Sequence, residues 1–312
     1  MVARFLRNLL VGQLIFMLLV GWLSYPYWQG VGGAIIAACL AMLALRLFIT
    51  LQNFVIAWFF QSETPAEFKL SPWQKIIWFV EEFYATLISS SWSMWRRTFS
   101  QRELSNSKQN TLPILLVHGY GCNSGYWTSL SAQLSARGLN HYAIDLEPIL
   151  AEIDDYVPML ANRIDAICAA TGHSQLIIIA HSMGGLVSRC YLRAHGHEKV
   201  AQLITLGSPH NGTGLANFGP GKNSRQMRYN KKTGGSAWLQ ALGASEDAAT
   251  RAKITSIFSY HDNIVSPQLS SQLSGAHNIA IHGTGHVALA LNRKVQQVLL
   301  AEIERILLAA EK

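Results

Sequence analysis

The chain has 312 residues, half of them hydrophobic and 14% charged, and its formal net charge is +7. Soluble domains are usually about a quarter charged, and the deficit here is local, because residues 1–60 carry only three charges, all arginine. The basic residues lie beside apolar segments and form no charged stripe, which argues against nucleic-acid binding and favours a basic surface facing a membrane. The four cysteines have neither pair nor metal spacing, so we expect free thiols.

Two apolar runs open the chain. Residues 9–28 follow two arginines and are long enough to cross a hydrocarbon core at about 1.5 Å per residue. Residues 31–60 are longer than a single span requires. We therefore expect their first two-thirds to cross the membrane, Arg46 to snorkel near one face, and residues 54–60 to lie at the interface.

The distribution of charge predicts how these runs are oriented. Positive charge lies before the first run and after the second, with none between them. By the positive-inside rule, residues 1–60 form a transmembrane helical hairpin with both ends in the cytoplasm. This predicts a protein of the cytoplasmic (inner) membrane whose remaining chain lies on the cytoplasmic side. The alternative is a cleaved signal peptide followed by one anchor, which places the remaining chain outside.

Residues 61–111 are expected to form a juxtamembrane region. Apolar residues recur at helical spacing over residues 71–97, which predicts an amphipathic helix. Ser71, Pro72 and Gln74 supply an N-cap, a first-position proline and a capping box. The apolar face of this helix lies either on the membrane surface or against the rest of the protein, and the pattern favours neither. The end of the region, residues 100–111, is polar and aperiodic and predicts a linker.

From Pro113 onward, short apolar runs alternate with helical patterns. Six runs are predicted to be strands, and apolar runs of this kind are typical of strands buried on both faces. We therefore expect a mostly parallel sheet of about six strands with helices on both faces, an α/β class domain over residues 112–312. An irregular stretch is expected at 211–235, a helix near 236–249, and a final helix from about Val287 to the end.

Polar residues follow directly after these predicted strands, where α/β proteins carry their chemistry. A histidine–glycine pair follows the first strand at 118–121, a serine turn follows the third at 181–185, an aspartate follows the fifth at 261–263, and a histidine follows the sixth at 283–286. A serine, an aspartate and a histidine therefore occur in that chain order, each just past a strand.

Five motifs, "LLVHGYG", "AHSMGG", "TLGSPHNGT", "SYHDNIVSP" and "GTGHVAL", carry a resemblance to the α/β-hydrolase family, and within it to small bacterial triacylglycerol lipases and carboxylesterases. The resemblance covers about residues 112–312. The family's commonest serine turn is G-x-S-x-G, whereas this chain has Ala180 in the first position. A tight turn from strand to helix needs small side chains near the serine, and alanine is small enough.

The resemblance implies a nucleophile and a general base. Ser182 is expected to attack the substrate, with the alternative that it only caps the following helix. His286 is expected to act first as general base and then as general acid, because it lies in a glycine-flanked loop after the last strand. His261 is its rival.

Asp262 is expected to orient the imidazole and to stabilise its charged form. Asp145 and Glu147 are rivals, but they precede the serine, which is the wrong order for this fold. The backbone N–H groups of Tyr120 and Met183 are expected to form the oxyanion hole.

Tyr120 and His181 are also expected to contact substrate, although His181 is adjacent to the nucleophile and is expected to point away from it. In the resembling family, the region corresponding to 211–235 often forms a lid or pocket wall. Here it carries several cations and no acid, which could meet anionic headgroups; a solvated loop is the alternative. No metal or phosphate-binding pattern is present, so we expect no cofactor.

These features together predict a membrane-anchored serine hydrolase that cleaves carboxylic esters, of lipids or other acyl esters, through an acyl-enzyme. Thioesterases, phospholipases and acyltransferases share this machinery, and the motifs do not separate them. A non-catalytic, hydrolase-like membrane scaffold is the alternative from another class. Protein partners, the acyl length and the headgroup do not follow from the sequence.

Overall fold

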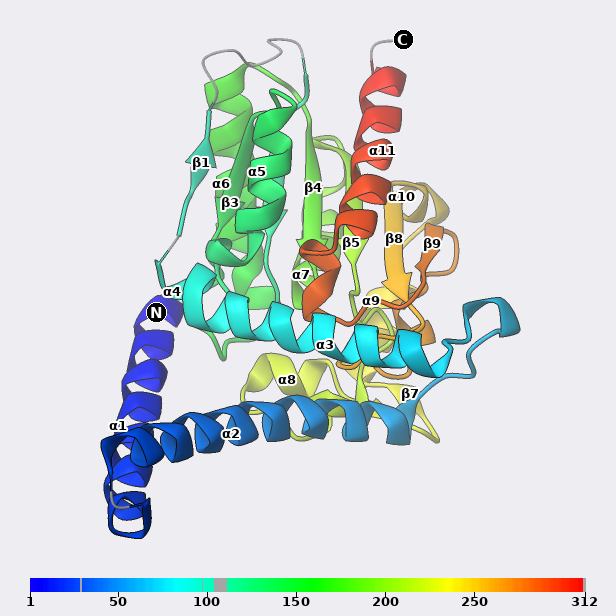
Figure 1. Ribbon diagram of the computed structural model, residues 1–312. Coiled ribbons are helices and arrows are strands. Elements are labelled where there is room, and N and C mark those ends of the chain that lie inside the picture. The colour runs from blue at the N-terminus through cyan, green and yellow to red at the C-terminus, as the bar shows by residue number, and fades with distance from the viewer. Residues whose placement is uncertain (29, 97, 104–110, 311–312) are drawn as a thin grey trace.

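A seven-stranded, mostly parallel sheet forms the centre of the protein (Figure 1). The structure is a computed structural model that describes residues 1–28, 30–96, 98–103 and 111–310. In sheet order the strands are β1 (Gln101–Arg102), β3 (His141–Ile144), β2 (Ile114–Val117), β4 (Leu176–His181), β5 (Val200–Leu206), β8 (Ile254–Ser259) and β9 (His277–Ile281). All neighbours pair in parallel except β1, which pairs antiparallel with β3.

The predicted mostly parallel sheet is thus confirmed, and its six parallel strands match the six apolar runs of the sequence. The short strand β1 was not predicted, because it lies in the segment that was expected to be only a linker. Residues 104–110 of that expected linker lie outside the described residues.

Helices cover both faces of the sheet, as expected. Alternate residues of each strand face opposite sides, so that Ile178 and Ala180 belong to one apolar core while Ile177 and Ile179 belong to the other. The first core is covered by α6 (Val157–Thr171), α7 (Met183–His195) and α9 (Ala237–Ala244), and the second by α5 (Thr128–Ala136) and α11 (Arg293–Ala310). A separate short helix, α10 (Ala248–Ala252), follows α9, so the single helix expected near 236–249 is two.

Short turns connect these elements. The 3₁₀ turns are η1 (Ala66–Phe68), η3 (Ser124–Trp127), η4 (Asp154–Tyr156), η5 (Gly214–Asn217), η6 (Gln268–Ser271) and η7 (Val287–Ala290). The final helix therefore begins at Arg293, after the turn η7, and not at Val287 as predicted.

Two long helices precede the sheet: α1 (Val2–Trp28) and α2 (Val31–Phe60). Both are long and apolar enough to cross a membrane, and little of either is buried inside the protein. They pack against each other near Gly21 and Ala34. In Figure 1 the start of α1 and the end of α2 both lie beside the rest of the protein, and the end of α1 and the start of α2 lie far from it. The transmembrane hairpin itself stays a prediction.

Arg46, which was expected to snorkel near one face of the membrane, has polar partners within the protein. Its guanidinium donates hydrogen bonds to Gln13 of α1, at 2.5 Å, and to the hydroxyls of Ser90 and Ser91, at 2.9 and 3.0 Å. The two serines belong to a π-helical turn, η2 (Ser89–Ser93). These groups satisfy the cation where three helical segments meet, and its place near a membrane face stays a prediction.

The predicted amphipathic helix is present as α3 (Pro72–Ile88), followed by η2 and a last turn, α4 (Met94–Arg96). The predicted capping box is confirmed, because Ser71 and Gln74 exchange side-chain and backbone hydrogen bonds. The helix lies across the carboxyl ends of the strands (Figure 1). Many of its large apolar side chains are exposed, whereas Trp78, Phe79 and Phe83 are half-buried and Glu82 and Ala85 are buried. Exposed along the outer face are Trp73, Ile76, Ile77, Val80, Tyr84 and Leu87.

The stretch at 211–235 consists of short elements and is not one open loop. It contains η5, the helix α8 (Lys222–Gln226) and a small antiparallel pair, β6 (Tyr229–Asn230) with β7 (Gly234–Gly235). These elements lie between the sheet and α2 (Figure 1). Gly214 lies under the ring of Phe60, where a Cβ atom would come within 2.3 Å of ring carbons.

Candidate active site

Ser182 lies in a sharp turn between β4 and α7. It is the one non-glycine residue with a positive φ among the described residues, with φ 54° and ψ −124°. A Cβ on Gly184 would come within 2.6 Å of the carbonyl oxygens of Val117 and His118, and a Cβ on Gly119 within 2.8 Å of the Cβ of Ser182. The turn is therefore crowded on both sides of the serine. Backbone strain of this kind concentrates at functional sites.

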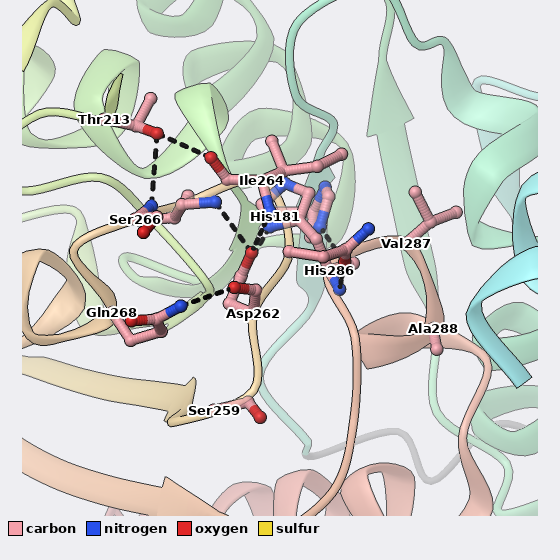
Figure 2. A network of polar contacts seen from close by, with 12 residues as sticks. His181, Thr213, Ser259, Asp262, Ile264, Ser266, Gln268, His286, Val287 and Ala288 are labelled. Atoms are coloured by element: carbon pink, nitrogen blue, oxygen red, sulfur yellow. Dashed lines mark hydrogen bonds and ion pairs between the residues drawn. The ribbon is translucent and has the colours of Figure 1, made fainter. Parts of the chain in front are cut away.

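Asp262 and His286 form a buried pair at the carboxyl ends of the neighbouring strands (Figure 2). The Nδ1 atom of His286 lies 2.7 Å from Oδ2 of Asp262. The other carboxylate oxygen, Oδ1, accepts hydrogen bonds from the amides of Ile264 and Val265, at 2.8 and 2.7 Å. Burial alone would lower the pKa of His286, but the charge and hydrogen bond of Asp262 outweigh it, and the pKa is raised.

Ser182 is connected to this pair through its neighbours. Its amide donates to the carbonyl of Leu206 at 2.9 Å, and the next residue, Gly207, lies so close to Asp262 and His286 that a Cβ there would come within 3.0 Å of Oδ2 and 3.3 Å of Nδ1. Within the described residues no hydrogen bond joins the Ser182 hydroxyl to His286. Catalytic hydrogen bonds often tighten only when substrate binds.

A cavity of about 250 Å³ opens onto Ser182. Its walls are mainly apolar and come from the stretch at 211–235 and from the loop after Asp262. Tyr120 lines it as well, and so do Gln52 and Ile56 of the long helix α2. One wall of the cavity is thus supplied by a segment far outside the hydrolase-like sequence.

Two amides next to Ser182 have the character of oxyanion donors. Met183 is the first residue of α7, so its N–H has no acceptor inside the helix. The amide of Tyr120 likewise makes no hydrogen bond to any other described residue. The phenol of Tyr120 donates to the carbonyl of Pro220 at 2.9 Å, which ties the loop after β2 to the stretch at 211–235.

His181 is buried and turned toward the histidine loop. Its ring lies 4.5 Å from the ring of His286, centroid to centroid, and its Nε2 lies 3.1 Å from the carbonyl oxygen of His286. Burial, followed by the proximity of His286, lowers the pKa of His181 well below its usual range. The side chain does not line the cavity at Ser182. Its predicted contact with substrate stays a prediction, and its observed contacts are with His286 and with the rings of Tyr126 and Trp127.

The rival residues lie in other environments. His261 accepts a hydrogen bond from the amide of Gly283 at Nδ1, 3.2 Å away, and burial lowers its pKa to about 4. Asp145 has a side chain 39% exposed, and its Oδ1 accepts from the amide of Ser124. Glu147 contacts the chain's amino terminus. None of the three is hydrogen-bonded to His286 or Asp262.

Sequence reasoning missed the N-terminal contributions to this region. Glu82 of α3 is fully buried against the loop that follows His286. Ser62, just after α2, donates its amide to Gln268, whose side-chain amide donates in turn to the carbonyl of Asp262 at 2.8 Å (Figure 2). No motif marks these residues. The only available signal was an acid within an otherwise apolar helical pattern.

The described residues contain no group of three or more His, Cys, Asp or Glu that could hold a metal ion. The four cysteines are free.

Known proteins resemble this chain in fold and in part of its sequence. A family model described as the alpha/beta hydrolase fold matches residues 113–230. Part of the chain is similar to a triacylglycerol lipase of Pseudarthrobacter phenanthrenivorans, with 31% identity over 114 residues, 34% of this chain and 35% of the lipase. Lipase B of Pseudozyma antarctica is 29% identical over 167 residues, 51% of this chain and 48% of that one.

Among solved structures, a mature Bacillus licheniformis lipase superimposes with a TM-score of 0.58 at 19% identity, covering 66% of this chain and 97% of the lipase. At that identity the likeness concerns the fold. The part of the chain from β2 onward therefore has the α/β-hydrolase fold. In sequence it is similar to triacylglycerol lipases, although the match spans only about a third of the length of the first of these relatives.

Proposed function

We propose that this protein is a membrane-anchored serine hydrolase that cleaves carboxylic esters of lipids through an acyl-enzyme. The observation that carries the proposal is the placement of a strained serine, Ser182, at the mouth of an apolar cavity beside the buried Asp262–His286 pair. The similarity to lipases supports an ester as the substrate class.

In the proposed reaction, Nε2 of His286 takes the proton of Ser182 as its Oγ bonds to the ester carbonyl carbon. The carbonyl electron pair moves to oxygen, where the amides of Tyr120 and Met183 bind the oxyanion. The intermediate collapses, and the leaving alcohol takes the proton from the imidazolium of His286. Water then repeats the sequence on the acyl-enzyme and releases the acid. Asp262 stabilises the imidazolium in both halves.

The lipid character of the substrate rests on the cavity. Most of its walls are apolar, and α2 contributes Ile56 and Gln52 to them. An acyl chain bound there would lie against a helix that is itself long and apolar enough to cross a membrane. The exposed apolar face of α3 extends the same side of the protein and would seat on a lipid surface.

For the anchor, we propose the hairpin of residues 1–60 in the cytoplasmic membrane, with the hydrolase domain on the cytoplasmic side. The absence of charge between the two runs supports this orientation. A reporter fused after Lys312 should be active only as a cytoplasmic reporter. Reporter activity in the periplasm or lumen would contradict the orientation but would leave the proposed reaction unaffected.

Thioesters and acyl acceptors other than water would use the same residues, so a thioesterase, a phospholipase or an acyltransferase remains the alternative within this machinery. A scaffold without activity is the alternative outside it. No separate contact in the described residues favours any of these over a lipid ester hydrolase.

The test uses the full chain in detergent. Wild-type protein should hydrolyse p-nitrophenyl esters and become labelled by a fluorophosphonate probe, and Ser182→Ala should abolish both. Ser135→Ala, on the outer helix α5, serves as the matched control and should behave as wild type. Equal hydrolysis by Ser182→Ala and wild type would exclude the mechanism, and a lack of Ser182-dependent labelling would favour the scaffold. A series of ester chain lengths, with and without vesicles, then defines the substrate.

A further inference from the structure

Glu82 is a buried acid whose partners belong to the loop of the histidine. It lies on α3, outside the hydrolase domain, and its side chain is fully buried. Its Oε1 accepts a hydrogen bond from the amide of Val287 and its Oε2 one from the amide of Ala288, both at 3.0 Å. These are the two residues that follow His286. The carboxylate therefore binds the backbone that carries the proposed base.

Gly285, the residue before the histidine, also packs closely against Glu82. A Cβ on Gly285 would come within 2.5 Å of Oε2 of Glu82, and its next nearest neighbours are also atoms of Glu82. As long as the Glu82 carboxylate lies here, position 285 accommodates no side chain larger than that of glycine. One side chain of α3 thus contacts the loop on both sides of His286.

The electrostatic surroundings of Glu82 link it to the ring as well as to the backbone. Burial raises the pKa of Glu82 to about 7, against the effect of its two hydrogen bonds and of nearby His286. The negative charge of Glu82 in turn contributes to raising the pKa of His286, after the larger effect of Asp262. Other titratable groups also face this loop: Tyr126, whose hydroxyl donates to the carbonyl of Val287, His181, packed on His286, and His261, whose Nδ1 accepts from the amide of Gly283.

The charged neighbour on the same helix has a different partner. Glu81 accepts a hydrogen bond from the side chain of Asn292, at 2.6 Å, beyond the turn η7. In the described part of the chain, neither Glu81 nor Glu82 forms an ion pair with lysine or arginine. Glu82 is thus a buried acid held by two backbone amides, with no cation other than the imidazolium that forms during the proposed reaction.

We infer that Glu82 is a positioning residue for the general base: a carboxylate from a membrane-facing helix that fixes the loop of His286. The inference rests on the proposed function. Through the two amides, Glu82 holds the backbone from which the imidazole projects between Asp262 and the serine. Through its charge, it favours the imidazolium in the transition state. A residue outside the hydrolase domain therefore fixes the position of the proposed base and favours its charged form.

The experiment compares Glu82→Gln with Glu81→Gln in the full chain, in detergent, across a range of pH. The carboxamide that replaces the Glu82 carboxylate keeps one acceptor but turns its NH₂ toward a backbone N–H, so one buried donor loses its partner. We expect kcat to fall about ten- to a hundredfold, from the cost of a lost hydrogen bond to a charged group. The acid limb of kcat/KM should move to lower pH, because Glu82, with a pKa of about 7, is ionised over the upper part of that limb and its anion then favours the imidazolium. Glu81→Gln should leave both unchanged.

Two further variants separate positioning from loss of fold. Glu82→Asp keeps the charge and should retain the wild-type acid limb even where kcat falls. Gly285→Ala should lower kcat strongly when it is introduced into the wild-type chain, and less when it is introduced into Glu82→Ala. The reason is that the two atoms nearest to the new methyl group belong to the carboxylate that Glu82→Ala removes. Additive losses would show that the two positions act separately.

The two proposals fail in different ways. If Ser182 is required for hydrolysis but Glu82→Gln matches wild type in kcat and acid limb, the positioning role is wrong and the proposed function stands. An acid limb that stays in place while kcat falls would reduce Glu82 to a structural contact. If Ser182→Ala hydrolyses esters like wild type, the proposed function is wrong, and the role of Glu82 with it.

Discussion

Asp262→Asn is the substitution whose outcome the geometry defines most closely. The Oδ1 atom of Asp262 accepts two backbone amides, from Ile264 and Val265. An asparagine at 262 must keep its carbonyl oxygen there, because its NH₂ group would otherwise face two N–H donors. The NH₂ then takes the place of Oδ2, opposite Nδ1 of His286.

The consequence for the base follows from the tautomer. Facing a donor, His286 must present the lone pair of Nδ1, and its proton moves to Nε2. An Nε2–H cannot take a proton from Ser182. With the fold and cavity intact, we expect kcat to fall about 10⁴-fold, the size of effect seen when a triad histidine is held in the wrong tautomer, or about 5 kcal/mol of transition-state stabilisation.

The assay is steady-state hydrolysis of a p-nitrophenyl ester by the detergent-solubilised full chain. Asp145→Asn is the matched control, because this acid also follows directly after a strand, β3, and accepts a hydrogen bond from a single backbone amide. We expect the control to stay within about threefold of wild type, as for a partly exposed group. A loss of less than about tenfold in Asp262→Asn, or an equal loss in the control, would show that this carboxylate does not set the tautomer of the base.

Four other outcomes follow from the same contacts. Gly184→Ala should cost about 1–3 kcal/mol in the free energy of unfolding, measured with denaturant, since its methyl meets backbone oxygens at 2.6 Å; an unchanged midpoint would contradict the close approach. Ile56→Trp should lower kcat/KM for long-chain esters and spare short ones, and a uniform effect would place the acyl chain elsewhere. Ile77→Glu, on the exposed face of α3, should slow hydrolysis of a vesicle-borne ester and leave a soluble ester unaffected; equal rates on vesicles would argue against lipid seating. Because the base must be neutral and the pKa of His286 is raised, kcat/KM should rise with pH through a midpoint above the ordinary value of about 6.5, and a midpoint below it would contradict the effect of Asp262.

The hydrolase fold was predictable because its central strands are buried on both faces. Strands β2 and β4 are apolar at almost every position, as in Ile177, Ile178 and Ile179, which are all fully buried. Such runs stand out in a sequence. The candidate site was readable for a related reason, since its residues follow directly after these strands and the sheet brings the strand ends together.

The orientation of α3 could not be predicted, because a helical period defines two faces and does not say which one faces the protein. Here the apolar face is exposed and the inner face carries Glu82. An acid on an amphipathic helix is usually solvated. Glu82 is buried instead because two backbone amides of a loop far along the chain donate hydrogen bonds to its carboxylate, and the helical pattern does not reveal them. The short strand β1 and the turns at 211–235 escaped prediction because elements of so few residues show no period.

The N-terminal helices complete the candidate site in three ways. Helix α2 supplies a wall of the cavity through Ile56, Ser62 supports the loop of Asp262 through Gln268, and α3 holds the loop of His286 through Glu82. In the domain from residue 112 alone, two buried amides would lose their acceptor, and the cavity would open along one side. Unsatisfied amides are costly to bury, so the loop of His286 would rearrange toward water. The helices that precede the sheet are therefore also part of the candidate site, and detaching them should impair hydrolysis even of a soluble ester.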